Sequence, residues 1–118
     1  MTGPDYPLAD TVDAVVGDGA AVFLERLERQ IAAFDRGLPE TQHVLVSVFL
    51  PGGHQIIAGS FSREGPQMVV VNGTDERGRQ VRLLAAGGNL HIVLTAVKRM
   101  ADRPAPVVRF QQGSGAPT

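Results

Sequence analysis

The feature that most constrains the fold of this chain is a change in hydrophobic period near His43. Before that residue, apolar side chains recur every three or four positions, which is the spacing of one helix face. These residues are Ala20, Phe23, Leu24, Leu27, Ile31 and Phe34. After it, apolar positions alternate with a period of two, as they do along a β-strand. One amphipathic helix followed by several alternating segments predicts an α+β fold.

The helix is expected over residues 19–36, and Gly37 is expected to end it. Residues 8–16 also have helical spacing. Residues 17–19, two glycines around an aspartate, interrupt this spacing. We therefore expect a separate short helix over residues 8–16 and a new start at Asp18, whose carboxylate can cap the longer helix.

Four segments rich in β-branched and other apolar residues follow, separated by turns that contain glycine. They are expected as strands over residues 43–50, 54–62, 68–71 and 80–86, joined as a meander. Alternation places Ile57, Gly59 and Phe61 on one face of the second strand. Residues 89–101 fit either a helix or a fifth strand, and their β-branched content favours the strand. Residues 107–110 are expected to add an edge strand.

A chain of 118 residues is long enough for one core, which is expected over residues 8–110. Residues 1–7 and 111–118 are rich in turn formers and poor in apolar side chains, so both ends are expected to be disordered. The chain has no cysteine, a net charge of -1 and no apolar run of membrane-spanning length. These properties predict a cytoplasmic protein without a membrane segment.

The chain lacks the residue spacings that are typical of catalytic and metal sites. His43, His54 and His91 fall on separate predicted elements, with no pair at metal-ligand spacing. No serine stands in a nucleophile motif, and Asp75 and Glu76 are neighbours on one loop rather than a separated acid–base pair. We therefore expect no enzymatic activity, no cofactor and no metal site.

Arg77, Arg79 and Arg82 form the most basic feature, around the turn before the fourth predicted strand. Guanidinium groups bind phosphates and carboxylates through paired hydrogen bonds. These arginines, together with His54 in an exposed turn, are the candidate ligand contacts. Two acidic residues in the same loop are close enough to neutralise the arginines, which favours a surface ion-pair network over a binding site.

The pattern Val-x-Val-x-Leu-x-x-Gly-x-x-Ile over residues 46–56 and the segment Gly-Asn-Leu at residues 88–90 are similar to the two motifs of the Sm/Hfq class of small β-barrels. The resemblance covers about residues 19–98. It implies a ring whose subunits pair their edge strands. Gly87 stands where many members of the class have arginine, so the resemblance does not carry over their RNA binding. The expected fold is therefore an N-terminal helix on a four- or five-stranded antiparallel meander, arranged as an SH3-like or Sm-like barrel or as an open sheet.

Residues 43–50 are apolar on both faces of the predicted strand, and one helix can cover only part of a small sheet. Leu45, Ser47 and Phe49 share one of these faces and are the expected interface of a homo-oligomer. The expected function is a non-catalytic, self-associating module that binds a protein partner. The alternatives are an Sm-like ring that binds RNA, which needs the three arginines on one exposed face, and a small-ligand-binding domain.

Overall fold

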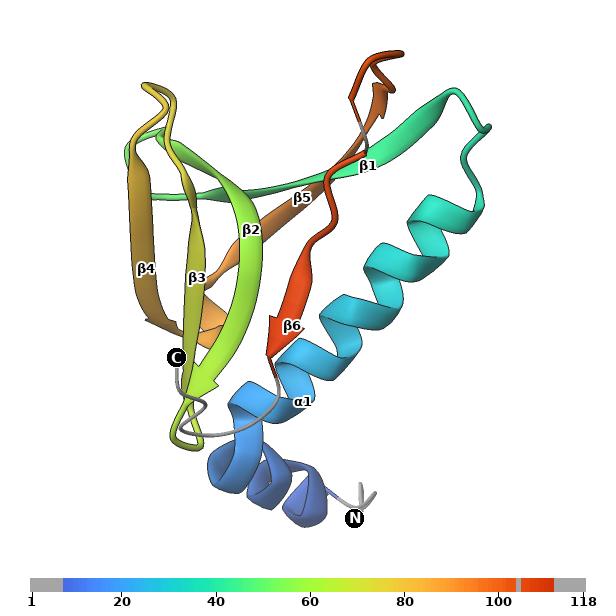
Figure 1. Ribbon diagram of the computed structural model, residues 1–118. Coiled ribbons are helices and arrows are strands. Elements are labelled where there is room, and N and C mark those ends of the chain that lie inside the picture. The colour runs from blue at the N-terminus through green and yellow to red at the C-terminus, as the bar shows by residue number, and fades with distance from the viewer. Residues whose placement is uncertain (1–7, 104, 112–118) are drawn as a thin grey trace.

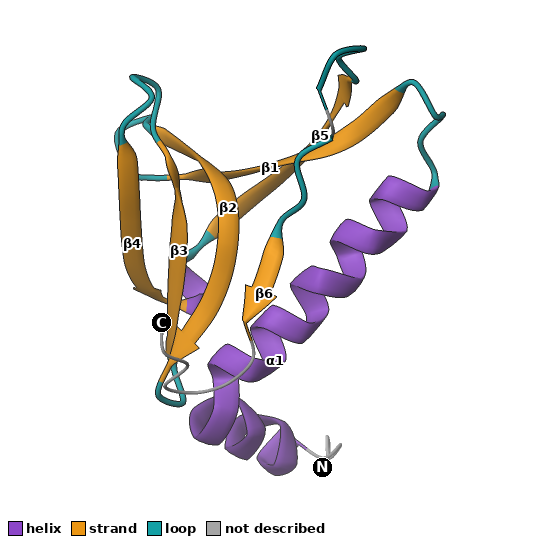
Figure 2. Ribbon diagram, viewed as in Figure 1, coloured by secondary structure: helices purple, strands orange, loops and turns teal. Residues whose placement is uncertain are grey.

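The computed structural model describes residues 8–103 and 105–111, which form one helix packed on one strongly bent sheet (Figure 1 and Figure 2). In chain order the elements are α1 (Leu8–Arg36), β1 (Gln42–Phe49), β2 (Gln55–Glu64), β3 (Met68–Thr74), β4 (Gln80–Ala86), the 3-10 turn η1 (Gly87–Asn89), β5 (His91–Lys98) and β6 (Arg109–Gln111). This arrangement confirms the predicted α+β fold and the strand after residue 90. The disorder predicted for residues 1–7 and 112–118 lies outside the described residues, whereas Gln111, predicted to begin the disordered tail, is the last residue of β6. Within the described part, no helix has the length and hydropathy of a membrane span.

The sheet has the order β4-β3-β2-β1-β5, and each neighbouring pair along this path is antiparallel. β1 pairs with β5 along its whole length but with β2 only over Ser47–Phe49, next to their shared turn. Beyond that turn β1 and β2 diverge (Figure 2). The short strand β6 runs parallel to β2 in the second half of β2. The segment predicted as an edge strand therefore lies beside β2 rather than at either end of the sheet.

A β-bulge at Gly59 changes which side chains of β2 face the core. The pairing of β2 with β3 shifts between Ala58 and Ser60, so Gly59 is the extra residue. Ala58 and Phe61 are both buried in the core, whereas Ile57 is half-buried. The expectation that Ile57, Gly59 and Phe61 share a face is wrong, because one inserted residue reverses the alternation.

The helix α1 is continuous through residues 17–19, so the expected short first helix and the cap at Asp18 are wrong. Figure 1 shows instead that α1 changes direction in its N-terminal third. The backbone N–H of Ala20 donates to the Pro66 carbonyl oxygen in the β2–β3 turn at 2.9 Å. A backbone amide bonded outside the helix is a local cause of bending. The glycines thus mark a bend in one helix.

The core lies between α1 and the inner face of the sheet. Its largest fully buried side chains are Phe61, Leu24, Val46, Val48, Val69 and Val71. The predicted helix stripe supplies Ala20, Leu24 and Leu27 to this core, while Phe34 at its far end is 36% exposed. Burial of the stripe against β1, β2 and β3 holds the helix across the bent sheet.

Candidate functional site

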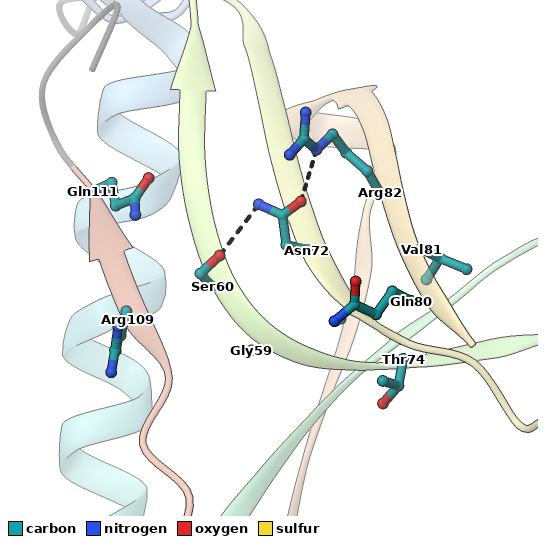
Figure 3. Close-up of a pocket in the computed structure, with 10 residues that line it drawn as sticks. Gly59, Ser60, Asn72, Thr74, Gln80, Val81, Arg82, Arg109 and Gln111 are labelled. Carbon is teal, nitrogen blue, oxygen red and sulfur yellow. Dashed lines mark hydrogen bonds between the residues drawn. The ribbon is translucent and has the colours of Figure 1, made fainter. Parts of the chain in front are cut away.

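Four side chains on four neighbouring strands lie in one row across the sheet. Arg109 of β6 pairs with Ser60 of β2, Ser60 pairs with Asn72 of β3, and Asn72 pairs with Arg82 of β4. All four line one groove, and Figure 3 shows their side chains. We call them the polar row.

Strand alternation explains why the polar row faces away from the core. Phe61 and Phe110 follow Ser60 and Arg109 directly, and their rings stack on the core side. The bulge at Gly59 is required for this arrangement, because uninterrupted alternation from the core residue Ala58 would turn Ser60 inward.

Hydrogen bonds connect three members of the polar row. Arg82 Nε donates to Asn72 Oδ1 at 2.7 Å, and Asn72 Nδ2 donates to Ser60 Oγ at 3.3 Å (Figure 3). Arginine has no acceptor, so Asn72 must turn its oxygen toward Arg82 and its amide nitrogen toward Ser60. Ser60 therefore accepts within the row and keeps its own hydroxyl proton for another acceptor.

The groove around the polar row has a volume of about 700 Å³. It is lined by Gly59, Ser60, Asn72, Gly73, Thr74, Gln80, Val81, Arg82, Arg109 and Gln111. Two of these residues carry a positive charge and none carries a negative charge. Both guanidinium-bearing residues are exposed, so the groove presents positive charge and hydrogen-bond donors to solvent.

Arg79, one of the predicted ligand contacts, is held by Asp75 at the tip of the β3–β4 hairpin. Its Nε and Nη2 atoms each lie 2.8 Å from Asp75 Oδ2. Asp75 Oδ1 also accepts the backbone N–H groups of Arg77 and Arg79, both at 2.9 Å. The pKa of Asp75 is lowered, first by the hydrogen bond from the Arg79 backbone and then by the Arg79 side chain. The ion pair favoured by the sequence is therefore present for Arg79.

The other predicted contacts lie in different surroundings. Arg82 is part of the polar row, while Arg77 is exposed in the hairpin turn. His54 in the β1–β2 turn is exposed, and its Nδ1 lies 3.8 Å from Oε2 of Glu76 in the β3–β4 turn. Arg79 and Arg82 are thus bound to different partners rather than directed at one shared ligand.

Sequence reasoning missed three of the four residues in the polar row. Ser60 and Asn72 look like ordinary strand residues, and Arg109 stands in a segment predicted only as an edge strand. Their one common signal is polarity at positions next to core aromatic or β-branched residues. That signal does not reveal which strands are neighbours.

The predicted interface residues lie on the outward face of β1. Phe49 is 38% exposed and Leu45 is half-buried, whereas Ser47 is only 4% exposed. Ser47 pairs with Ile57 on one side and with Val93, which is 43% exposed, on the other. The small serine therefore lies among larger apolar neighbours. We call Leu45, Phe49, Ile57 and Val93 the outer β1 patch.

A second groove, of about 650 Å³, lies between α1 and β5. Its lining residues are Gly19, Val22, Phe23, Arg26, Leu27, Gln30, Gly88, Leu90, Ile92 and Leu94. Most of these side chains are apolar. The groove runs beside β5, which is one end of the sheet.

The three histidines stay apart. His43 is 8% exposed and its Nδ1 lies 3.1 Å from the Val44 carbonyl oxygen, while His54 and His91 are exposed. Across residues 8–103 and 105–111, no group of three potential metal ligands is present.

Comparison with protein-family models, with curated proteins and with solved structures gave no match to this chain.

Proposed function

We propose that this protein is a non-catalytic assembly module that joins copies of itself through the edges of its sheet. The observation that carries the proposal is that β4 and β5 end the strand order, so each has a neighbour on one side only among the described strands. A free strand edge presents unpaired N–H and C=O groups to another chain.

Both edges also leave core-facing side chains incompletely covered. Val81 and Leu83 of β4 are half-buried, and so are Ile92 and Leu94 of β5. If β4 of one copy pairs with β5 of the next, these two apolar rows meet and continue the core across the interface. The incoming strand also lies beside the groove between α1 and β5.

The two edges are of similar length but belong to different strands, with seven residues in β4 and eight in β5. Pairing between different surfaces is head-to-tail, and it produces a ring when the rotation closes. A ring formed in this way is also what the resemblance to the Sm/Hfq class implies. An extended segment of another protein can use the same edge, which is how the module would bind a protein partner.

The polar groups on the sheet support a non-catalytic role. Ser60, the hydroxyl group in the polar row, accepts its hydrogen bond from an amide instead of donating to a basic side chain. The RNA-binding alternative receives less support, since Arg79 is neutralised by Asp75 and is bound apart from Arg82.

The assembly is tested by sedimentation velocity on the untagged protein at tens of micromolar. We expect a species well above 12.5 kDa, the mass of one chain. Leu84→Lys on β4 and Val93→Lys on β5 place a charge at edge-strand positions that are 55% and 43% exposed, so the single chain should still fold. Each substitution should shift the protein toward 12.5 kDa.

Val107→Lys is the matched control, because Val107 is 77% exposed and precedes β6 rather than lying at a sheet edge. It should leave the assembly unchanged. A single 12.5 kDa species for the unsubstituted protein would contradict the proposal.

A further inference from the structure

The polar row directs hydrogen-bond donors toward the groove. The Arg82 guanidinium uses Nε on Asn72, which leaves the four N–H bonds of its two terminal nitrogens. Asn72 Nδ2 in turn donates to Ser60 Oγ, and the Ser60 hydroxyl proton forms no hydrogen bond within the row. Both hydrogen bonds therefore run in the same direction, from Arg82 to Asn72 and from Asn72 to Ser60. The Ser60 O–H at the end of this series is left to donate to an acceptor outside the row.

The next side chain in the row cannot provide that acceptor. Arg109 pairs with Ser60 and, like every arginine, offers donors alone. Ser60 and Arg109 are paired on β2 and β6, and both line the groove. A ligand that carries several oxygens can accept from both groups within this groove, and negatively charged oxygens form the stronger hydrogen bonds.

The charges around the groove favour the same conclusion. Arg82 and Arg109 are both exposed, and the groove lining contains no carboxylate. Of the two acidic residues at the adjacent hairpin tip, Asp75 is engaged by Arg79, and Glu76 accepts the backbone N–H of Gln55. The positive charge of the groove is therefore not compensated by its own lining.

We propose that the polar row is a binding site for linked phosphate groups, with Arg82 and Arg109 at its two ends and with Ser60 and Asn72 between them. This site is separate from the edges proposed for assembly. Phosphate accepts several donors at once and pairs with guanidinium in a bidentate manner.

The spacing of the row favours two linked phosphates over one. Arg109 and Arg82 are three strand spacings apart, which is about 14 Å measured along the sheet. One phosphate contacts the Arg109 end of the row, whereas a second, linked phosphate extends toward Arg82. The groove has no aromatic lining residue on which a base would stack, so recognition is directed at the phosphates.

The test is an NMR titration of the full chain with pyrophosphate and, separately, with inorganic phosphate. The side-chain signals of Asn72 and the Nε–H of Arg82 should shift, together with the backbone signals of Ser60 and Arg109. Pyrophosphate should bind more tightly than phosphate. Arg82→Gln and Arg109→Gln should each weaken pyrophosphate binding by about tenfold or more, as expected for loss of a charged hydrogen-bonding group.

Arg77→Gln is the matched control, since it removes the same charge from an exposed residue outside the groove. It should change the affinity less than twofold (about 0.4 kcal/mol). Arg82→Lys should restore part of the affinity, because lysine keeps the charge but not the bidentate geometry. The proposal would be overturned if Arg77→Gln and Arg82→Gln lost the same amount of pyrophosphate affinity, or if pyrophosphate did not bind at millimolar concentration.

A short single-stranded oligonucleotide serves as a third probe, and it distinguishes the source of the phosphates. If the oligonucleotide binds more tightly than pyrophosphate and this binding is lost in Arg82→Gln, the site is supported and its ligand is a nucleic-acid backbone. If pyrophosphate binds more tightly than the oligonucleotide, the site is supported and its ligand is a small diphosphate. The Val93→Lys variant should bind pyrophosphate normally even when its assembly is blocked, which separates this inference from the proposed function.

Discussion

The rings of Phe61 and Phe110 stack with their centroids 5.3 Å apart and their planes 14° from parallel. Phe61 is fully buried in the core, and Phe110 is the central residue of β6. The stack therefore attaches the last strand to the core. Because Arg109 and Gln111 flank Phe110 and line the groove on the other face, the same contact positions one wall of the proposed phosphate site.

Phe110→Ala should lower the free energy of unfolding by about 3 kcal/mol. This is the lower end of the range for phenylalanine truncation, since the ring is half-buried, and it includes about 1 kcal/mol for the aromatic pair. Urea denaturation measures the change. Val107→Ala, at a position that is 77% exposed, should change stability by less than about 0.5 kcal/mol. Equal losses for the two variants would show that the stack does not hold β6.

Gly73→Ala should be strongly destabilising, by about 3 kcal/mol or more. A methyl group at Gly73 would overlap the backbone carbonyl oxygen of Ile57 and would lie 2.8 Å from Ile56 Cγ2. The first obstacle is backbone of the neighbouring strand β2, which cannot move without breaking the pairing of β2 and β3. Thermal unfolding by circular dichroism measures the loss.

Gly59→Ala is the control for this steric argument. A methyl group there would lie 3.5 Å from the Asn72 carbonyl oxygen, which is an ordinary van der Waals distance. Stability should change by less than about 1 kcal/mol. A Gly59→Ala protein as unstable as Gly73→Ala would mean that glycine is needed at both sites for a reason other than close packing.

The hairpin tip should make stability depend on pH in the acidic range. The folded-state pKa of Asp75 is lowered below its ordinary value of 3.8 by the backbone and side chain of Arg79. A lowered pKa stabilises the folded state at pH values above the ordinary value, and this contribution disappears as the pH falls below 3.8 through the folded pKa.

Urea denaturation at a series of pH values tests this dependence in the native protein and in Asp75→Asn. The difference in stability between the two proteins should be constant above about pH 5 and should shrink as the pH falls below about 4. Asp102→Asn, in the exposed turn after β5, is the control for loss of one acidic charge. A pH-independent difference between the native protein and Asp75→Asn would contradict the expected titration.

The main elements of the fold could be predicted from hydrophobic period because period depends on neighbouring residues alone. The stripe that includes Leu24 and Leu27 does pack on the sheet, and Val46 and Val48 do face the core. The bulge at Gly59 could not be predicted in this way. A single extra residue leaves the composition of the strand unchanged but reverses the direction of every later side chain.

The candidate site depended on information that local patterns do not contain. Arg82 stands out in the sequence as one of three clustered arginines, yet its partner Asn72 is known only when β3 and β4 are paired. Arg109 joins the row because β6 runs parallel to β2, a contact between distant parts of the chain. The ion pair of Arg79, by contrast, could be predicted from the sequence, since its acidic partner Asp75 is only four residues away.

Phe49→Glu should leave the single chain folded and should weaken self-association if the outer β1 patch, which contains the predicted interface residues Leu45 and Phe49, is a contact surface between copies. The Phe49 side chain lies on the outward face and is 38% exposed, so the new carboxylate can reach water. Val48→Glu at the next residue is the contrasting variant, because Val48 is fully buried and an unpaired charge there should unfold the protein. Circular dichroism reports folding of both variants, and sedimentation velocity reports assembly of Phe49→Glu. Unfolding of Phe49→Glu would mean that its side chain is core rather than surface, and unchanged assembly would exclude the patch as a contact between copies.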